Sequence, residues 1–128
     1  MDTRLAVRAF AIIGSILCGQ PLLALEAGLL LRACESQNDR SLGFCMGYIG
    51  GIYEGVILHD DYANAVRSAQ GDEKEVRTWC APSNISYEDM AAYLVEFLNH
   101  NPRYVTNRIH AEVTVYAFFS DKFSCSTS

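Results

Sequence analysis

The sequence predicts an all-α fold, a small disulfide-bonded bundle of about four helices that follows a signal peptide. Apolar residues recur at a spacing of three to four in several segments, which is typical of helices that bury one face. Cap residues and breaks at proline mark where these segments begin and end. Five cysteines among 128 residues, with no Cys-x-x-Cys pair, favour disulfides in an oxidising compartment over a zinc or redox site.

The N-terminal segment has the layout of a secretory signal peptide. Arg4 and Arg8 precede a short apolar run, and Pro21 would break a membrane-spanning helix there. We expect residues 1–24 to be removed, residues 25–128 to form the mature domain, and no stable membrane insertion to remain. A retained N-terminal anchor is the alternative.

The charge of the chain narrows the class of partner. The formal net charge is −5, and removal of residues 1–24 leaves 8 basic and 14 acidic residues, a charge of −6. An acidic surface disfavours binding to nucleic acid and to anionic membranes. It is compatible with a basic protein partner or simply with solubility.

Residues 26–33 are expected to form a short helix before the most distinctive stretch, residues 41–58, for which Ser41 is the expected N-cap. Glycine recurs there at every fourth position, at Gly43, Gly47, Gly51 and Gly55. Such positions share one helix face, and apolar residues such as Tyr48 surround it. Each interior glycine costs about 1 kcal/mol in helix propensity. We therefore expect another helix, in the chain or across a dimer, to pack against this face; a glycine-rich loop is the alternative.

The remaining elements follow from their cap signals. Residues 59–78 are the least regular part, a polar stretch with room for two or three helical turns. Ser86 and Asp89 form a capping box for a helix that ends at Asn101-Pro102. Thr106 or Asn107 is expected to cap the last helix, with Ile109, Val113, Tyr116 and Ala117 on one face. A short link at the proline predicts that the last two helices are antiparallel.

Four cysteines remain in the predicted mature chain: Cys34, Cys45, Cys80 and Cys125. Antiparallel helices would gather them at one pole of the bundle, where they would form two disulfides. Each disulfide would contribute about 2–4 kcal/mol, mainly by restricting the unfolded chain. Four cysteines allow three pairings, which the sequence does not separate; the weak preference is Cys45–Cys80 with Cys34–Cys125.

No combination of residues in the sequence indicates catalysis or a cofactor. His59, His100 and His110 have no nucleophile or ligand pattern around them. His59 with Asp60 and Asp61 is too closely spaced to be a typical metal site. The helical spacing of the glycines does not match a phosphate-binding loop. We expect no enzyme activity, no cofactor and no metal.

Two motifs resemble those of the Rap/Tai immunity proteins. Phe44-Cys45-Met46-Gly47-Tyr48-Ile49-Gly50-Gly51 resembles the Cys-x-Gly-Tyr-Ile-x-Gly signature of that family. Cys80-Ala81-Pro82, followed by a capped helix and an Asn-Pro break, resembles its second half, and Phe123-Ser124-Cys125 stands near its closing Phe-Pro-Cys, with serine in place of proline. The resemblance covers about residues 34–125.

The resemblance implies a periplasmic helical protein, often dimeric and disulfide-bonded. It further implies binding and inhibition of a peptidoglycan-cleaving amidase delivered by type VI secretion. The matching residues belong to the scaffold and do not identify the toxin. The alternative is a small periplasmic chaperone for acid stress, or a lipid carrier, with no toxin partner.

Residues 59–78 are the candidate contact with a partner. They offer a tyrosine among acidic residues: Asp60, Asp61, Tyr62, Asp72, Glu73 and Glu75. Aromatic residues dominate the energy of many interfaces, and charges steer the encounter. We hypothesise that Tyr62 inserts into the partner and that the carboxylates complement a basic rim. A mobile linker, with binding through a helix face or a dimer edge, is the alternative.

Overall fold

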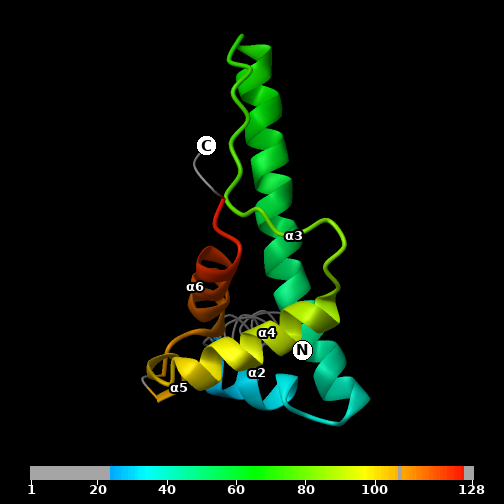
Figure 1. Cartoon of the computed structure of the whole chain (residues 1–128), viewed down its shortest axis with the longest axis vertical. Coiled ribbons are helices and arrows are strands. Elements are labelled where there is room, and N and C mark those ends of the chain that lie inside the picture. The colour runs from blue at the N-terminus through cyan, green and yellow to red at the C-terminus, as the bar shows by residue number, and fades with distance from the viewer. Residues whose placement is uncertain (1–23, 107, 126–128) are drawn as a thin grey trace, which may run out of the picture.

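The computed structural model describes residues 24–106 and 108–125, which contain five α-helices and no β-strand. All of the predicted signal peptide except Ala24, including Cys18, lies outside the described residues. Helices α2 (Ala27–Cys34), α4 (Tyr87–His100) and α6 (Ala111–Lys122) pack against α3 (Asp39–Ala69), and the short α5 (Arg103–Thr106) packs against α2 (Figure 1). The prediction of an all-α fold with two disulfides is confirmed.

Helix α3 is much longer than the sequence suggested. It spans 31 residues, so residues 59–69, expected to be mostly irregular, continue the helix. Its N-cap is Asn38, whose side chain accepts from the backbone N–H groups of Arg40 and Ser41, and not Ser41 as predicted. The chain leaves the helix through Gln70 and Gly71, which has a φ of +85° that suits glycine.

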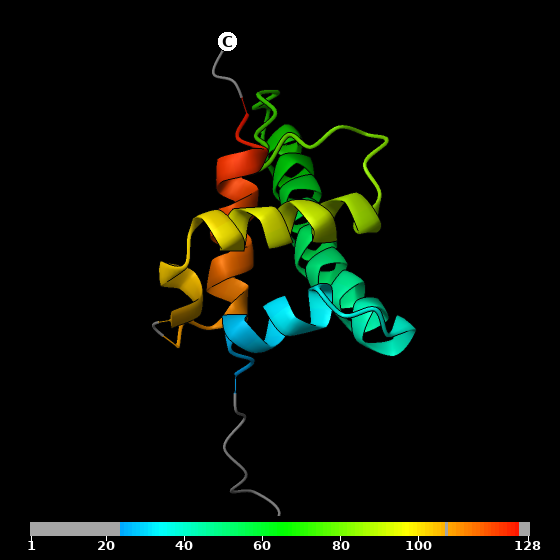
Figure 2. The same cartoon turned by 60° about the horizontal axis from the view of Figure 1, so that its bottom comes forward.

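The second half of α3 extends beyond the other helices. The segment that follows it, residues 70–78, runs back along the helix toward the bundle (Figures 1 and 2). We call residues 58–78 the protrusion, and the rest of the described chain the bundle. The polar stretch of the sequence is therefore a helix and its return segment, which lie side by side.

The helices of the bundle enclose an aromatic core. Trp79, Phe118 and Phe119 are almost fully buried, and the Phe119 ring centroid lies 4.7 Å from that of Trp79 and 4.9 Å from that of Phe118. The capping box of Ser86 and Asp89 begins α4 as predicted, and Met90, Leu94 and Leu98 of α4 are buried. Residues from α2, α3, α4 and α6 thus share one core.

Two predictions about the last helices are wrong. Helix α4 crosses α6 in both views and does not run antiparallel to it (Figures 1 and 2), because the link between them is long enough to contain α5. Thr106 ends α5, and α6 begins after His110. The buried face of α6 carries Phe118 and Phe119, whereas Val113 and Tyr116 are exposed.

The disulfides join Cys34 to Cys45 and Cys80 to Cys125. This corrects the preferred pairing of Cys45 with Cys80 and Cys34 with Cys125. The first bond closes the turn between α2 and the start of α3, and the second joins the end of the return segment to the residues after α6. The four cysteines do not gather at one pole, because α4 crosses the bundle and α6 ends beside the return segment (Figure 1).

Candidate partner-binding site

The protrusion is held together by side chains of α3 that bond the return segment. The Asn64 amide donates to the Val76 carbonyl and accepts from the Val76 N–H, both at 2.9 Å. A side-chain amide thereby makes the two bonds that a neighbouring strand would make with one residue. The return segment is consequently fixed along α3 without forming a sheet.

Asp60 is placed at the base of the protrusion and is only 5% exposed. Its carboxylate accepts from the Thr78 N–H at 2.6 Å and from the Thr78 hydroxyl at 2.8 Å. Loss of these bonds would leave a buried carboxylate without its partners, which is costly. Asp60 therefore serves the fold and is not accessible to a partner, contrary to its predicted role.

Two arginines occupy three of the other carboxylates. Arg77 donates to Asp61 at 2.6 Å and to Glu75 at 2.7 Å, and Arg67 bonds Asp72. The hydrogen bond from Arg67, and then that from the Lys74 N–H, hold the pKa of Asp72 below its usual value. Exposed ion pairs of this kind each contribute about 0–1 kcal/mol. Asp61, Asp72 and Glu75 thus shape the protrusion and are only partly free to meet a partner.

The base of the protrusion is bound firmly to the bundle. Trp79, at the end of the return segment, is 2% exposed and donates from its indole to Ser120 at 3.2 Å. The next residue, Cys80, forms the disulfide to Cys125, and its N–H donates to the Phe123 carbonyl at 2.8 Å. The protrusion therefore projects from a fixed point of the core.

Tyr62 and Glu73 are the predicted partner-binding residues that remain exposed and free of polar contacts with the described residues. The Tyr62 side chain is 70% exposed on the outer face of α3, and Leu58, one turn earlier, is 71% exposed. Glu73 at the tip is exposed and has no hydrogen bond or ion pair with the described residues. Leu58 was not predicted, because an apolar residue at three-to-four spacing in a helix normally indicates a buried position.

The glycine face of α3 is open. No atom lies within 4 Å of a Cβ placed at Gly43, Gly47, Gly51 or Gly55, leaving aside the helix itself. The expected packing of another helix against this face is therefore wrong within the described chain. The close contact occurs instead at Gly50, which is not one of the glycines spaced four residues apart. A Cβ at Gly50 would lie 3.1 Å from the ring of Tyr87 in α4. Tyr48 instead lies toward α6, with its hydroxyl 3.4 Å from Glu112.

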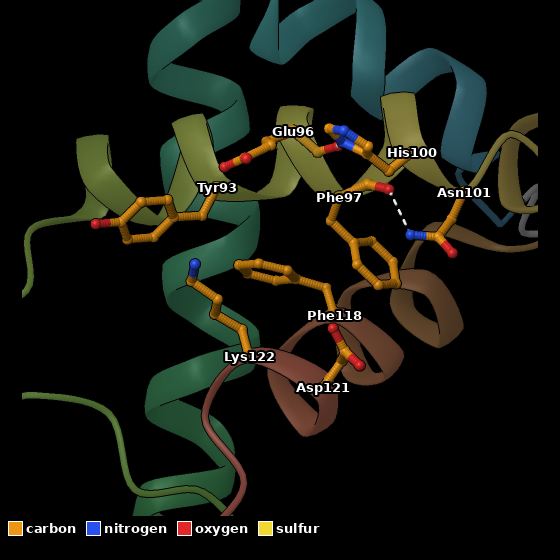
Figure 3. Close-up of a pocket in the computed structure, with 8 residues that line it drawn as sticks. All are labelled: Tyr93, Glu96, Phe97, His100, Asn101, Phe118, Asp121 and Lys122. Atoms are coloured by element: carbon orange, nitrogen blue, oxygen red, sulfur yellow. Dashed lines mark hydrogen bonds between the residues drawn. The ribbon is translucent and has the colours of Figure 1, made fainter.

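Helices α4 and α6 border a surface cavity of about 200 Å³ (Figure 3). Phe97 and Phe118 form part of its wall, and the Lys122 ammonium lies 4.3 Å from the centre of the Tyr93 ring. Its polar residues are Glu96, His100, Asn101, Asp121 and Lys122. His100 Nδ1 donates to the Glu96 carbonyl oxygen at 2.8 Å, so this imidazole bonds the last turn of α4 and has no nucleophile beside it among the described residues.

Metal-binding side chains do not gather in the described part of the chain. No group of three or more histidine, cysteine, aspartate or glutamate side chains is close enough there to hold an ion. The four described cysteines are all engaged in disulfides.

Comparison with known proteins identifies the family. The family model for Rap1a immunity proteins matches residues 26–125. No curated protein and no solved structure matches the chain. The match covers all five described helices and both disulfides, and it confirms the resemblance carried by the Cys45 and Cys80 motifs. The chain belongs to the Rap1a immunity protein family.

Proposed function

We propose that the protein protects the cell that makes it by binding and occluding a peptidoglycan-cleaving amidase effector of a type VI secretion system. Membership of the immunity family supports the binding of an effector protein. The amidase and the secretion system are implied by the family resemblance. In this proposal the protein catalyses no reaction, because occlusion needs only a surface that fits the effector.

The proposed site of action is the periplasm. Both disulfides fit an oxidising compartment. A cell-wall amidase also meets its substrate there. The predicted signal peptide, residues 1–24, would deliver the chain to this compartment.

The protrusion is the proposed contact with the effector, and its fixed shape is the observation that carries the proposal. It projects from the bundle, presents Tyr62 at 70% exposure, and is held by Asn64, Asp60 and Arg77. A segment ordered before binding loses less conformational entropy on binding. Residues 58–78 hold five acidic and three basic residues, so their net charge of −2 steers them toward a basic rim.

The test is the affinity for any peptidoglycan amidase that is encoded next to the gene of this protein. Tyr62→Ala is expected to weaken binding by about 2 kcal/mol, roughly 30-fold in Kd, if Tyr62 inserts into the effector. The matched control is Tyr93→Ala, a partly exposed tyrosine of the bundle on α4. Isothermal titration calorimetry and inhibition of peptidoglycan cleavage would both be measured.

The possible results distinguish the immunity function from the location of the contact surface. Wild-type protein that neither binds nor inhibits the amidase would contradict the immunity proposal for that effector. Binding that is unchanged in Tyr62→Ala but lost in Tyr93→Ala would place the contact on the bundle. Glu73→Gln, which removes the unpaired charge of the tip, is expected to slow association by less than a factor of ten, and this effect should fade at high salt.

A further inference from the structure

The cavity between α4 and α6 presents hydrogen-bond acceptors from two neutral side chains whose donors are already used. The Asn101 Nδ2 donates to the Phe97 carbonyl at 2.8 Å, which leaves Oδ1 as the unused atom of this amide (Figure 3). The His100 Nδ1 donates to the Glu96 carbonyl at 2.8 Å, so the Nε2 of the neutral ring is an acceptor. Both bonds belong to the end of α4. The fold of the helix end therefore decides that these two side chains offer acceptors to a ligand.

Two carboxylates border the same cavity without a partner. Glu96 lies on α4 and Asp121 on α6, and neither carboxylate forms a hydrogen bond or an ion pair within the described part of the chain. The cavity also lies against the last turns of both helices, where the backbone carbonyls carry a partial negative charge. The electrostatic environment of the cavity therefore favours a cation.

Lys122 is the basic side chain of the cavity, and it leaves the acceptors open. Its ammonium lies 4.3 Å from the centre of the Tyr93 ring, at the opposite end of the cavity from Asn101 (Figure 3). It pairs with neither Glu96 nor Asp121. Two carboxylates and one ammonium give the lining a net charge of −1. One end of the cavity thus already holds a cation of the chain itself, and the other end has only acceptors.

The wall between the two ends is aromatic. Phe118 is fully buried, Phe97 is half-buried, and their ring centroids lie 5.7 Å apart. The faces of aromatic rings attract cations, and a guanidinium adds the stacking of its own plane. Its five N–H groups point outward in that plane and can reach several acceptors at once, whereas an ammonium is a compact and strongly hydrated point charge.

We propose that the cavity between α4 and α6 is a binding site for a guanidinium group. The aromatic wall of Phe97 and Phe118 lies against the plane of the group, and Glu96, Asp121 and Asn101 accept from its N–H groups. The volume of about 200 Å³ is below the roughly 300–1,000 Å³ of most sites for drug-sized molecules, so the site suits one side chain or a small amino acid. The ligand is therefore an arginine side chain of a polypeptide or free arginine.

Other classes of ligand fit the cavity less well. The described chain has no group of three or more histidine, cysteine, aspartate or glutamate side chains that could hold a metal ion. A phosphate or another anion would meet two carboxylates and two helix C-termini. An apolar ligand would leave the acceptors of His100 and Asn101 unpaired, which costs free energy.

The experiment is an NMR titration of the mature, disulfide-bonded protein with N-acetyl-arginine amide, a probe whose only charge is the guanidinium. We expect saturable shifts of the Asn101 side-chain amide and the His100 ring, with a Kd in the millimolar range. N-acetyl-citrulline amide has nearly the same shape without the charge and should cause no saturable shift. Free arginine distinguishes the two sources of the ligand. Equal affinity for both arginine probes supports a side chain in a polypeptide, and tighter binding of free arginine supports the amino acid, whose carboxylate would meet Lys122.

Variants of exposed residues test the named contacts. The double variant Glu96→Gln with Asp121→Asn should weaken binding of the blocked arginine about tenfold. Glu88→Gln, the same kind of change in the first turn of α4 and outside the cavity, is the matched control and should bind like the wild type. Lys122→Met should strengthen binding about twofold to fivefold, because it removes a repelling cation.

Three results would overturn the proposal: no saturable shift with the blocked arginine, equal shifts with the citrulline probe, or a double variant that binds as well as Glu88→Gln. Spectra that are unchanged outside the cavity show that each variant is folded. The site lies on the bundle and the probes are not effectors. These results are therefore independent of the proposed immunity function.

Discussion

The bundle and the protrusion are stabilised by different interactions. The bundle buries aromatic and aliphatic side chains from four helices around Trp79, Phe118 and Phe119. The protrusion has exposed apolar residues and is held by hydrogen bonds and ion pairs between α3 and its return segment. Burial makes the bundle a stable support, and polar pairing fixes the shape of the protrusion while its outer face stays exposed.

The two regions should differ most in how much the free energy of unfolding falls when an aromatic ring is removed from each. Phe119→Ala deletes a fully buried ring that contacts Trp79, Phe118 and Tyr53. It is expected to lower the free energy of unfolding by about 3–5 kcal/mol. Tyr62→Ala, in the protrusion, should change it by about 0.5 kcal/mol or less. Urea unfolding followed by circular dichroism measures both, and comparable losses would contradict the division into two regions.

The two disulfides should differ by a smaller amount in their contributions to the free energy of unfolding. Cys80 and Cys125 are separated by 45 residues in sequence, and Cys34 and Cys45 by 11. From the entropy of the unfolded chain, the longer loop predicts a contribution of about 4 kcal/mol and the shorter one about 3 kcal/mol. We expect the double variant Cys80→Ser with Cys125→Ser to be the less stable of the two double variants.

The disulfide comparison also tests the pairing itself. Peptide mapping of non-reduced protein should recover Cys34 linked to Cys45 and Cys80 linked to Cys125. Only the loss of Cys80–Cys125 should accelerate amide exchange in the return segment, because this bond holds the base of the protrusion to the end of α6. Faster exchange there after loss of Cys34–Cys45 would contradict the separate roles of the two bonds.

The sequence was sufficient for features that depend on local signals. The capping box at Ser86 and Asp89 defines the start of α4. The apolar pattern at three-to-four spacing predicts a buried face formed by Met90, Tyr93, Leu94, Phe97 and Leu98, of which Met90, Leu94 and Leu98 are buried, Phe97 is half-buried and Tyr93 is exposed. The number of disulfides followed from the cysteine count. These features depend on residues close together in the chain, or on composition, and no knowledge of tertiary packing is needed to recognise them.

Tertiary contacts decided the features that the sequence did not reveal. In residues 59–69 the apolar residues do not recur at a clear helical spacing. The reason is that one side of the helix bonds the return segment and the opposite side is exposed, so neither side is buried in an apolar core. Asp60 resembles a surface carboxylate until Thr78 is placed beside it. The open environment of Gly51 was also hidden, since a glycine in an amphipathic helix equally fits close packing and exposure. The acidic residues of the candidate site all lie on the protrusion, but most of them form bonds within the protrusion itself.

The smallest expected effect is a pH dependence confined to the tip of the protrusion. The Arg67 hydrogen bond, followed by that from the Lys74 N–H, keeps the pKa of Asp72 below the ordinary value of 3.8. A carboxyl group whose pKa is lowered in the folded state stabilises that state above its ordinary pKa, and this contribution is lost as the pH falls through the lowered value. Asp72 is exposed, so the change should loosen the tip and leave the bundle folded.

The backbone amide of Lys74, whose N–H donates to Asp72 at 3.1 Å, reports the titration in NMR spectra. Its midpoint should lie below 3.8 in the wild type and rise toward that value in Arg67→Met. Asp89 provides the internal control, because the Ser86 hydroxyl and N–H lower its pKa and Arg67 takes no part. A Lys74 midpoint that does not move in Arg67→Met would show that the ion pair does not hold the tip in solution.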